Sequence, residues 1–385
     1  MNSSHPCAVF RSKACRTATV GFTGWLAGIL LICGLANPFQ PAHAEPPATL
    51  KVMEQNLYLG GTVSTLALAT TPQQLATAIA QFWASVQATN FPERADSIAD
   101  GIAAESPHII GLSEAALWRT GPADGIGNPN GGNAAVVVYD TIQILLDKLA
   151  ARGHHYTAIA VSSDADREIT LRTAAGLRDI RWTDRNAILV RTDLPTQVFS
   201  VGTPVVQRYE VMAATFVPVL NLVVTTPHSW LSVDVTLRGR KVRFVTTHLS
   251  PLNPAVQAAE LDELLAGPLD TSDPTVLTGD LNSAADPGTG VPGFTETPTY
   301  IDLLVAGFQD AWMANHANDP GYTCCQALNL RNDPSSLVVR IDYILTRGAI
   351  SAVTTHRVGV DPEDRTVSGM WPSDHAGLVS VLQTQ

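Results

Sequence analysis

Short apolar segments of this chain repeatedly end in, or carry, a side chain with a carboxylate, carboxamide or imidazole group. In the segment 276–283, a β-prone run is followed by Asp280 and Asn282, and a strand points side chains two positions apart to one face. Taken alone, this pair also fits an ordinary turn. The recurrence of the pattern favours a fold that gathers strand ends at one rim. The residues concerned are Asn56, Glu114, His248, Asp280, Asn282, Asp342, Asp374 and His375.

The rest of the sequence alternates between segments of strand and helix character. Apolar residues at helical spacing predict helices at 72–88, from 92 onward, at 139–152 and at 255–265. Strands are expected at 50–56, 107–114, 156–162, 185–191, 226–236, 241–248, 275–278, 337–346 and 376–382, and a loop at 121–132. Because several neighbouring strands are linked as hairpins, we expect mixed or antiparallel sheets covered by helices.

Residues 1–44 have the features of a secretory signal peptide. Three basic residues precede an apolar run from 20 to 36, and Ala-His-Ala at 42–44 forms a small-x-small cleavage signature. The alternative is a membrane anchor, although the run is broken by glycines and is close to the lower length limit for spanning. A lipid-modified Cys33 is disfavoured because Ile32, rather than a small residue, precedes it. We therefore expect an exported protein, secreted or periplasmic.

Residues 45–385 are expected to form one domain with loop insertions, since no Gly/Ser linker, charge block or repeat divides them. The whole chain has a net charge of −11, and loss of residues 1–44 removes three positive charges and no negative ones, which leaves −14. This balance disfavours tight nonspecific binding to nucleic acid, which needs a basic surface. A phosphate-bearing substrate is still compatible with it, because bound divalent cations change the local sign of the charge.

Two of the five cysteines, Cys324 and Cys325, lie outside the expected signal peptide. Consecutive Cα atoms are ~3.8 Å apart, below the usual disulfide span, so a bond between adjacent cysteines is expected to be strained. Free thiols or an intermolecular bond are at least as well supported by the sequence. Two cysteines alone do not complete a structural zinc site.

The ordered set of motifs resembles the endonuclease/exonuclease/phosphatase family of metal-dependent phosphoesterases with a deoxyribonuclease I-like fold. Each motif is weak, but their order along nearly all of residues 45–385 makes the set specific. The resemblance implies an α/β (α+β) fold: a four-layer α/β sandwich of two packed, mainly antiparallel β-sheets flanked by helices. The segments that carry it are Glu54-Gln-Asn56, Gly111-Leu-Ser-Glu114, Thr246-Thr-His248-Leu, Gly279-Asp280-Leu-Asn282, Arg340-Ile-Asp342-Tyr-Ile and Ser373-Asp374-His375.

The resemblance also implies a Mg²⁺-dependent hydrolase that attacks a phosphoester with an activated water, with Mn²⁺ or Ca²⁺ as alternative ions. Glu114 is the first-choice metal ligand, since carboxylate oxygens suit Mg²⁺, and Asn56 is expected to help position the metal or the phosphate. Asp280 would deprotonate the attacking water. Asn282 would donate a hydrogen bond to a phosphate oxygen.

His375 is expected to stabilise the pentacovalent phosphorus, with Asp342 as the carboxylate that fixes its tautomer. The alternative for Asp342 is an ion pair with Arg340. Asp374 is expected to hold a second metal or to orient His375. These assignments follow from the resemblance, residue by residue.

His248, Asn282 and Arg185 are the expected substrate contacts, with His248 acting as a second phosphate ligand or as an acid. Arg181 and Asp184 could line the same cleft, or they could be exposed charges at a strand edge. Tyr58 occupies a position at which some relatives carry an acid, which disfavours any metal site that depends on that acid.

The substrate is left open by the sequence. Nucleic acid is not indicated by the charge, and membrane lipid, inositol phosphate or a small organophosphate are alternatives. The apolar segment 216–230 fits either a bilayer-facing hairpin or core strands. A monomer is expected, and the rival to an enzyme is a catalytically silent binding module on the same fold.

Overall fold

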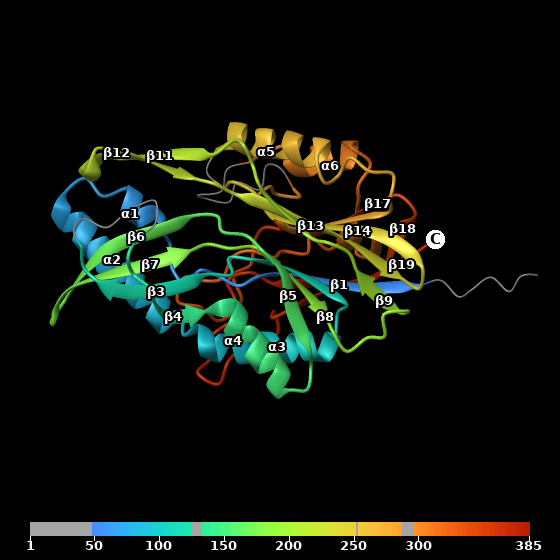
Figure 1. Cartoon of the computed structure of the whole chain (residues 1–385), viewed down its shortest axis with the longest axis horizontal. Helices are drawn as coiled ribbons and strands as arrows, with labels where there is room; N and C mark the ends of the chain where they lie inside the picture. The colour runs from blue at the N-terminus through green and yellow to red at the C-terminus, as the bar shows by residue number, and fades with distance from the viewer. Residues whose placement is uncertain (1–47, 125–131, 252, 287–295) are drawn as a thin grey trace, which may run out of the picture. The chain divides into compact units, whose positions relative to one another are not determined.

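The computed structural model describes residues 48–124, 132–251, 253–286 and 296–385, and two packed β-sheets organise them (Figure 1). The six-stranded sheet has the order β18-β19-β1-β2-β8-β5. Its strands β1 and β2 are parallel, and its other neighbours are antiparallel. The strands are β1 (Thr49–Asn56), β2 (Ile109–Ser113), β5 (Tyr156–Val161), β8 (Ala187–Arg191), β18 (Ile350–Val358) and β19 (Gly377–Thr384).

The second sheet has the order β10-β13-β14-β15-β17-β16, and β9 also pairs with β13. Here β14 and β15 are the parallel pair, and the other pairs are antiparallel. Both sheets are therefore mainly antiparallel, as predicted. The strands are β9 (Phe199–Val201), β10 (Val205–Arg208), β13 (Ser229–Leu237), β14 (Arg240–His248), β15 (Thr275–Asp280), β16 (Gln309–Asp310) and β17 (Asp342–Arg347).

Helices cover the outer face of each sheet. Helices α3 (Phe91–Glu105) and α4 (Thr141–Ala151) pack on the six-stranded sheet, and α5 (Pro254–Ala266) and α6 (Thr299–Val305) pack on the other (Figure 1). Apolar side chains on the inner faces, such as Val52, Phe244 and Ile344, form the core between the sheets. The predicted four-layer α/β sandwich is confirmed. Among the described residues, no helix has both the length and the apolar character needed to cross a bilayer.

Two smaller sheets extend the sandwich. One of them contains a hairpin at 166–183, between the strands expected at 156–162 and 185–191. Its polar residues alternate with apolar ones such as Ile180, which packs against the helix at 72–88. The hairpin of β11 and β12 forms a sheet of its own, so part of the apolar segment 216–230 lies outside the core. The remaining elements are β3 (Leu117–Pro122), β4 (Val136–Asp140), β6 (Asp166–Thr173), β7 (Gly176–Thr183), β11 (Ala213–Val217), β12 (Leu222–Thr226), α1 (Ser64–Ala67), α2 (Pro72–Ala88), α7 (Ala311–Asn315) and two short 3₁₀ turns at Pro218–Leu220 and Pro362–Asp364.

Local sequence explains where the main helices begin. Helix α2 follows a capping box formed by Thr71 and Gln74, and α5 follows Asn253, whose side chain accepts hydrogen bonds from two backbone N–H groups of the first turn. In both helices a proline follows the cap, where no backbone N–H is needed. The predicted signal peptide and residues 125–131 of the predicted loop lie outside the described residues.

A buried arginine on α3 holds two loops that carry site residues. The Arg94 guanidinium donates to the carbonyl oxygens of Leu57 at 2.8 Å and Tyr58 at 3.2 Å, directly after Asn56. It also donates to the carbonyl of Pro372 at 2.8 Å, shortly before His375. This one side chain therefore ties the end of β1 to the segment that enters β19.

We expect Arg94→Met to lower the free energy of unfolding by about 3 kcal/mol or more, because several buried carbonyl groups would lose their donor. Urea denaturation of the two proteins measures this difference. The matched control is Arg172→Met at an exposed position of β6, which should change stability by less than about 0.5 kcal/mol. Equal effects of the two substitutions would contradict the anchoring role.

Candidate active site

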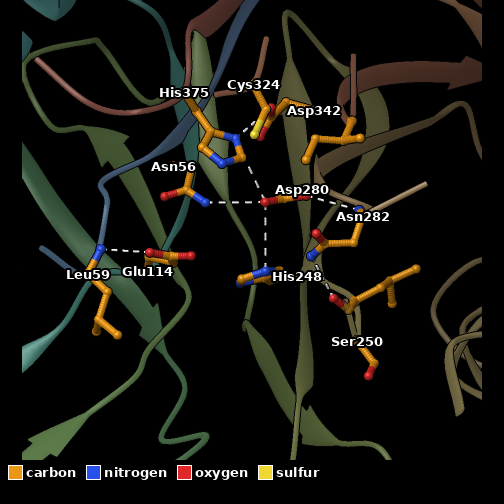
Figure 2. Close-up of polar contacts among 12 residues, drawn as sticks. Asn56, Leu59, Glu114, His248, Ser250, Asp280, Asn282, Cys324, Asp342 and His375 are labelled. Carbon is orange, nitrogen blue, oxygen red and sulfur yellow. Dashed lines mark hydrogen bonds and ion pairs between the residues drawn. The ribbon is translucent and has the colours of Figure 1, made fainter. Parts of the chain in front are cut away.

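The polar residues predicted to share a rim do meet at one edge of the two sheets. Strands β1, β14 and β15 end there, β2 ends just before Glu114, and β17 begins there. The turn that enters β19 brings in two more residues. Strand alternation explains the convergence, since each strand places its last inward-facing side chain at the same edge. Figure 2 shows seven of these residues together: Asn56, Glu114, His248, Asp280, Asn282, Asp342 and His375. Asp374 lies close enough to His375 and Glu114 to interact with their charges.

Asp280 is the hub of this cluster. The Asn56 side-chain amide donates to Asp280 Oδ2 at 3.2 Å, which links the two sheets. The same oxygen lies 3.7 Å from His248 Nε2 and 3.8 Å from His375 Nδ1 (Figure 2). Burial and the Asp342 carboxylate raise the pKa of Asp280 to about 6, against the opposing effect of both histidines. This places the carboxyl group near the range in which a general base works at neutral pH.

The backbone around Asp280 requires special conformations. Gly279 has φ +136°, and a Cβ there would lie 1.9 Å from the carbonyl oxygen of Thr247, so only glycine lets β15 pass β14 this closely. Asn282 has φ 47°, in the left-handed region that asparagine tolerates best among non-glycine residues. Its backbone N–H donates to Asp280 Oδ1 at 2.9 Å, and its side-chain amide donates to the carbonyl of Leu249 at 2.9 Å. The motif therefore fixes both side chains locally.

His375 and Asp342 form a buried pair across the two sheets. His375 Nδ1 lies 2.8 Å from Asp342 Oδ2. Burial alone would lower the pKa of His375, but the carboxylates of Asp342, Asp374 and Asp280 reverse that effect and raise it well above its usual range. The alternative ion pair with Arg340 is absent, because Arg340 pairs with Asp310 instead. Asp342 is thus available to fix the imidazole.

His248 lies beside a second group of buried polar residues. Burial opposes protonation of His248, yet the charges of Asp280, Glu114 and Asp184 raise its pKa. The ring centroids of His248 and His228 are 6.1 Å apart. His228 Nδ1 in turn lies 2.8 Å from Glu260 Oε1. The sequence analysis did not identify His228 or Glu260. An acid on the buried face of α5 was the signal that could have found the latter.

Glu114 lies close enough to Asp184 and to Asp374 for its charge to act on both carboxyl groups. The Leu59 backbone N–H donates to Glu114 Oε2 at 2.6 Å. Burial, and then the charge of Glu114, raise the pKa of Asp184 to about 7. Burial also raises the pKa of Asp374 to about 7, where the charge of His375 opposes the shift and the charge of Glu114 adds to it. Within the described part of the chain, Asp184 Oδ1 is buried without a hydrogen-bond partner.

This donor set fits a hard divalent cation. Glu114 lies close enough to both Asp184 and Asp374 for its charge to raise their pKa, and a bound cation would relieve this repulsion. Oxygen ligands suit Mg²⁺, Mn²⁺ or Ca²⁺ rather than a soft metal. Asn56 is hydrogen-bonded within the protein, since its side-chain oxygen accepts from the Tyr58 N–H at 2.8 Å and its amide donates to Asp280. Its contacts therefore indicate a positioning role.

Arg185 lies at the site and bonds to the protein through part of its guanidinium. Its Nε donates to the carbonyl of Ala115 at 2.7 Å and its Nη2 pairs with Asp140 at 2.7 Å. These contacts hold the segment after Glu114, and a substrate contact by Arg185 stays a prediction. Arg181 is similarly engaged by Asp166. Sequence alone cannot separate a supporting arginine from a substrate-facing one.

Glu54 is a further acid beneath the site that the sequence analysis missed. It lies two positions before Asn56 on β1, is 1% exposed, and neither carboxylate oxygen has a hydrogen-bond partner among the described residues. Burial, and then the charges of Asp342 and Asp280, raise its pKa well above the usual range. The alternation that points Asn56 inward also points Glu54 inward, which was the available signal.

Comparison with protein-family profiles matches residues 82–375 to the Endonuclease/Exonuclease/phosphatase family. No curated protein matches the sequence. Among solved structures, an endonuclease/exonuclease/phosphatase from Beutenbergia cavernae is 23% identical, with 88% of this chain and 72% of that chain covered and a TM-score of 0.51. A protein of this family from Leptotrichia buccalis is 14% identical, with 86% and 98% covered and a TM-score of 0.51. These likenesses support the same fold.

We expect a divalent cation to stabilise the protein more at pH 8 than at pH 5. Raised pKa values of about 6 for Asp280 and about 7 for Asp184 and Asp374 mean that these groups favour folding while protonated. That contribution is complete below an unfolded pKa of about 3.9 and is lost as pH rises through 6 to 7, where a cation replaces the protons. The melting temperature with Mg²⁺ or with EDTA, at both pH values, measures the effect.

At a hundredfold excess over Kd, the cation should add about 2.7 kcal/mol of stability at pH 8. Glu114→Gln should reduce this gain, whereas Glu363→Gln at an exposed position should keep it. An equal gain in the two variants would place the cation elsewhere.

Proposed function

The chain belongs to the endonuclease/exonuclease/phosphatase family, and we propose that it is a Mg²⁺-dependent phosphodiesterase that hydrolyses its substrate by in-line attack of water. The family includes metal-dependent phosphoesterases and nucleases. The observation that carries the proposal is the environment of Asp280. A buried carboxylate with a pKa of about 6 lies between two histidines, and an asparagine on each side fixes its two oxygens.

Asp280 is the proposed general base. Its Oδ1 is held by the Asn282 N–H and its Oδ2 by the Asn56 amide, so the carboxylate keeps one orientation. It would accept a proton from the water whose oxygen forms the new bond to phosphorus. General-base help of this kind contributes typically about 10² to 10⁴ in rate.

The histidines are the proposed stabilisers of the phosphoryl group and the leaving oxygen. With Nδ1 of His375 against Asp342, Nε2 is the nitrogen that can meet a phosphoryl oxygen as negative charge develops. His248 is the proposed acid for the departing oxygen, and the Asn282 side chain is a proposed phosphate contact. Glu114 and Asp374 would hold the cation, which when bound neutralises phosphate charge.

Asp280→Asn and His375→Ala should each lower kcat on bis-p-nitrophenyl phosphate about a hundredfold or more, because each removes a group that acts in the transition state. Initial rates with excess Mg²⁺ measure this, and EDTA should abolish turnover. Asp262→Asn, at an exposed position of α5, is the matched control and should retain activity. If bis-p-nitrophenyl phosphate, plasmid DNA and sphingomyelin all show no chelator-sensitive turnover, the chain is a silent binding module.

The hairpin β11–β12 favours a lipid phosphodiester as the substrate over nucleic acid. Phe216 is 54% exposed and its cross-strand partner Val223 is 57% exposed. Residues 211–227 contain no charged side chain, and neither do residues 55–92, which include α1. Helix α1 packs against β11, so these two uncharged segments meet. An uncharged apolar surface suits a bilayer and offers nothing to a nucleic-acid backbone.

The proposed location agrees with this substrate class. We propose that residues 1–44 direct export, because the basic start, apolar run and cleavage signature occur in the order that a signal peptide requires. An exported phosphodiesterase with an apolar hairpin would meet lipid surfaces outside the cytoplasm. The secreted endonuclease is the other candidate, and the net charge of −11 does not favour it.

The double variant Phe216→Ser/Val223→Ser should lower turnover of sphingomyelin or phosphatidylcholine in vesicles about tenfold or more, because each buried apolar side chain contributes about 1.5–3 kcal/mol. Hydrolysis of soluble bis-p-nitrophenyl phosphate should stay the same. Val305→Ser removes an exposed valine, 81% accessible, outside the hairpin and is the control. Faster cleavage of DNA than of lipid, with no effect of the hairpin variant, would favour the endonuclease.

A further inference from the structure

A disulfide between adjacent cysteines lies against the Asp342–His375 pair. Cys324 and Cys325 are bonded in the structure, which decides among the states that the sequence left open. Both sulfurs lie within 4.8 Å of a ring nitrogen of His375. Cys324 is buried, and Figure 2 shows it beside Asp342 and His375. Hydrolysis as proposed above uses neither sulfur.

The two members of the pair belong to different sheets. Asp342 begins β17 in the seven-stranded sheet, and His375 directly precedes the β19 region of the six-stranded sheet. Because β17 and β19 belong to separate sheets, no strand pairing connects them. The 2.8 Å separation of Asp342 Oδ2 and His375 Nδ1 therefore depends on what holds the sheets together at this edge.

The segment 323–326, which contains the disulfide, bonds to the β17 side. The Thr323 hydroxyl accepts from the backbone N–H of Asp342 at 3.2 Å. Cys324 N–H donates to the carbonyl of Val339 at 2.9 Å, and the Val339 N–H donates back to Cys324 at 3.0 Å. These bonds fix the backbone that leads into Asp342.

The same segment also bonds to the β19 side. The Ala376 N–H donates to the carbonyl of Thr323 at 2.8 Å, and the Gln326 N–H donates to the carbonyl of Asp374 at 2.9 Å. The backbones of Cys324 and His375 also form an isolated antiparallel β-bridge. The backbone on both sides of His375 is thus held by residues 323–326, which form a clamp between the two sheets.

We propose that the Cys324–Cys325 disulfide is a reversible modification site that positions His375 against Asp342 by keeping the clamp, residues 323–326, in one conformation. The bond closes a small ring through the intervening peptide, so the backbone at the centre of the clamp has few alternatives. Both sulfurs also lie within 4.8 Å of a ring nitrogen of His375. This role rests on the proposed function, since it concerns the same site.

Reduction breaks the Sγ–Sγ bond and requires two electrons and two protons. A phosphine reductant supplies the electrons, becomes a phosphine oxide with the oxygen of water, and leaves the two hydrogens of that water on the thiols. Reoxidation by a small-molecule disulfide transfers the same two electrons and two protons to that disulfide, which leaves as two thiols while the Sγ–Sγ bond forms again. In the reduced protein the clamp gains freedom and His375 loses its fixed position.

We expect reduction to lower kcat on bis-p-nitrophenyl phosphate about tenfold or more with KM changed by less than about twofold, because a small displacement of a transition-state group affects the chemical step. The full chain is reduced with a phosphine, freed of reductant, and assayed in excess Mg²⁺. Mass spectrometry of the alkylated peptide confirms the thiol state. Reoxidation should restore kcat, which a purely structural loss of folded protein would not show.

The double variant Cys324→Ser/Cys325→Ser should have the low kcat permanently and no response to reductant. The triple variant Cys7→Ser/Cys15→Ser/Cys33→Ser, which keeps the disulfide, should respond like the natural chain. A fully reduced natural chain that keeps kcat within about twofold overturns the positioning role.

A second readout separates this proposal from the proposed function. The imidazole ring resonances of His375, assigned by their loss in His375→Ala, should shift on reduction whether or not the chosen phosphoester is a substrate. If the oxidised chain hydrolyses nothing yet these resonances shift, the proposed function fails and the clamp stands. Unchanged resonances in a fully reduced protein overturn the clamp.

Discussion

The hydrogen bond from the Asn56 amide to Asp280 Oδ2, 3.2 Å long, is the contact on which the site depends. Asn56 ends a strand of one sheet and Asp280 ends a strand of the other, so this bond holds the seam between the sheets closed where the chemistry is placed. The core between the two sheets is apolar, whereas the side chains at this edge of the sheets are polar. The packing of two sheets therefore decides that acids and histidines from distant parts of the chain share one small volume.

Crowding of buried acids follows from that packing. Asp184, Asp280 and Asp374 are all shifted toward their protonated forms by burial, and two of them also by the charge of Glu114. His248 and His375 are shifted toward their charged forms by the same carboxylates. The site thus balances its charge partly from within and leaves a deficit of positive charge that a divalent cation would fill. The acidic net charge of the chain is consistent with a metal-assisted approach to phosphate rather than with a basic groove.

Much of this arrangement was predictable because strands alternate their side chains. The rule placed Asn56, His248 and Asp280, which end their strands, at one rim. Asn282 lies two residues past β15 with a left-handed backbone, so the turn after the strand places it instead. Strand alternation could not show whether Arg185 holds the backbone or contacts a substrate, because its guanidinium reaches backbone carbonyls that are distant in sequence. Nor could it show that the hairpin containing Phe216 stands outside both sheets, since strand pairing is a tertiary property. The state of Cys324 and Cys325 was likewise decided by their surroundings, which sequence spacing does not contain.

The position of strand β19 has a consequence for how the site is assembled. Strand β19 lies inside its sheet, between β18 and β1, and the residues directly before it include His375. Its partner β1 is the first strand described, so this pairing joins the two ends of the fold. His375 therefore reaches its place only when a pairing between segments far apart in the sequence has formed.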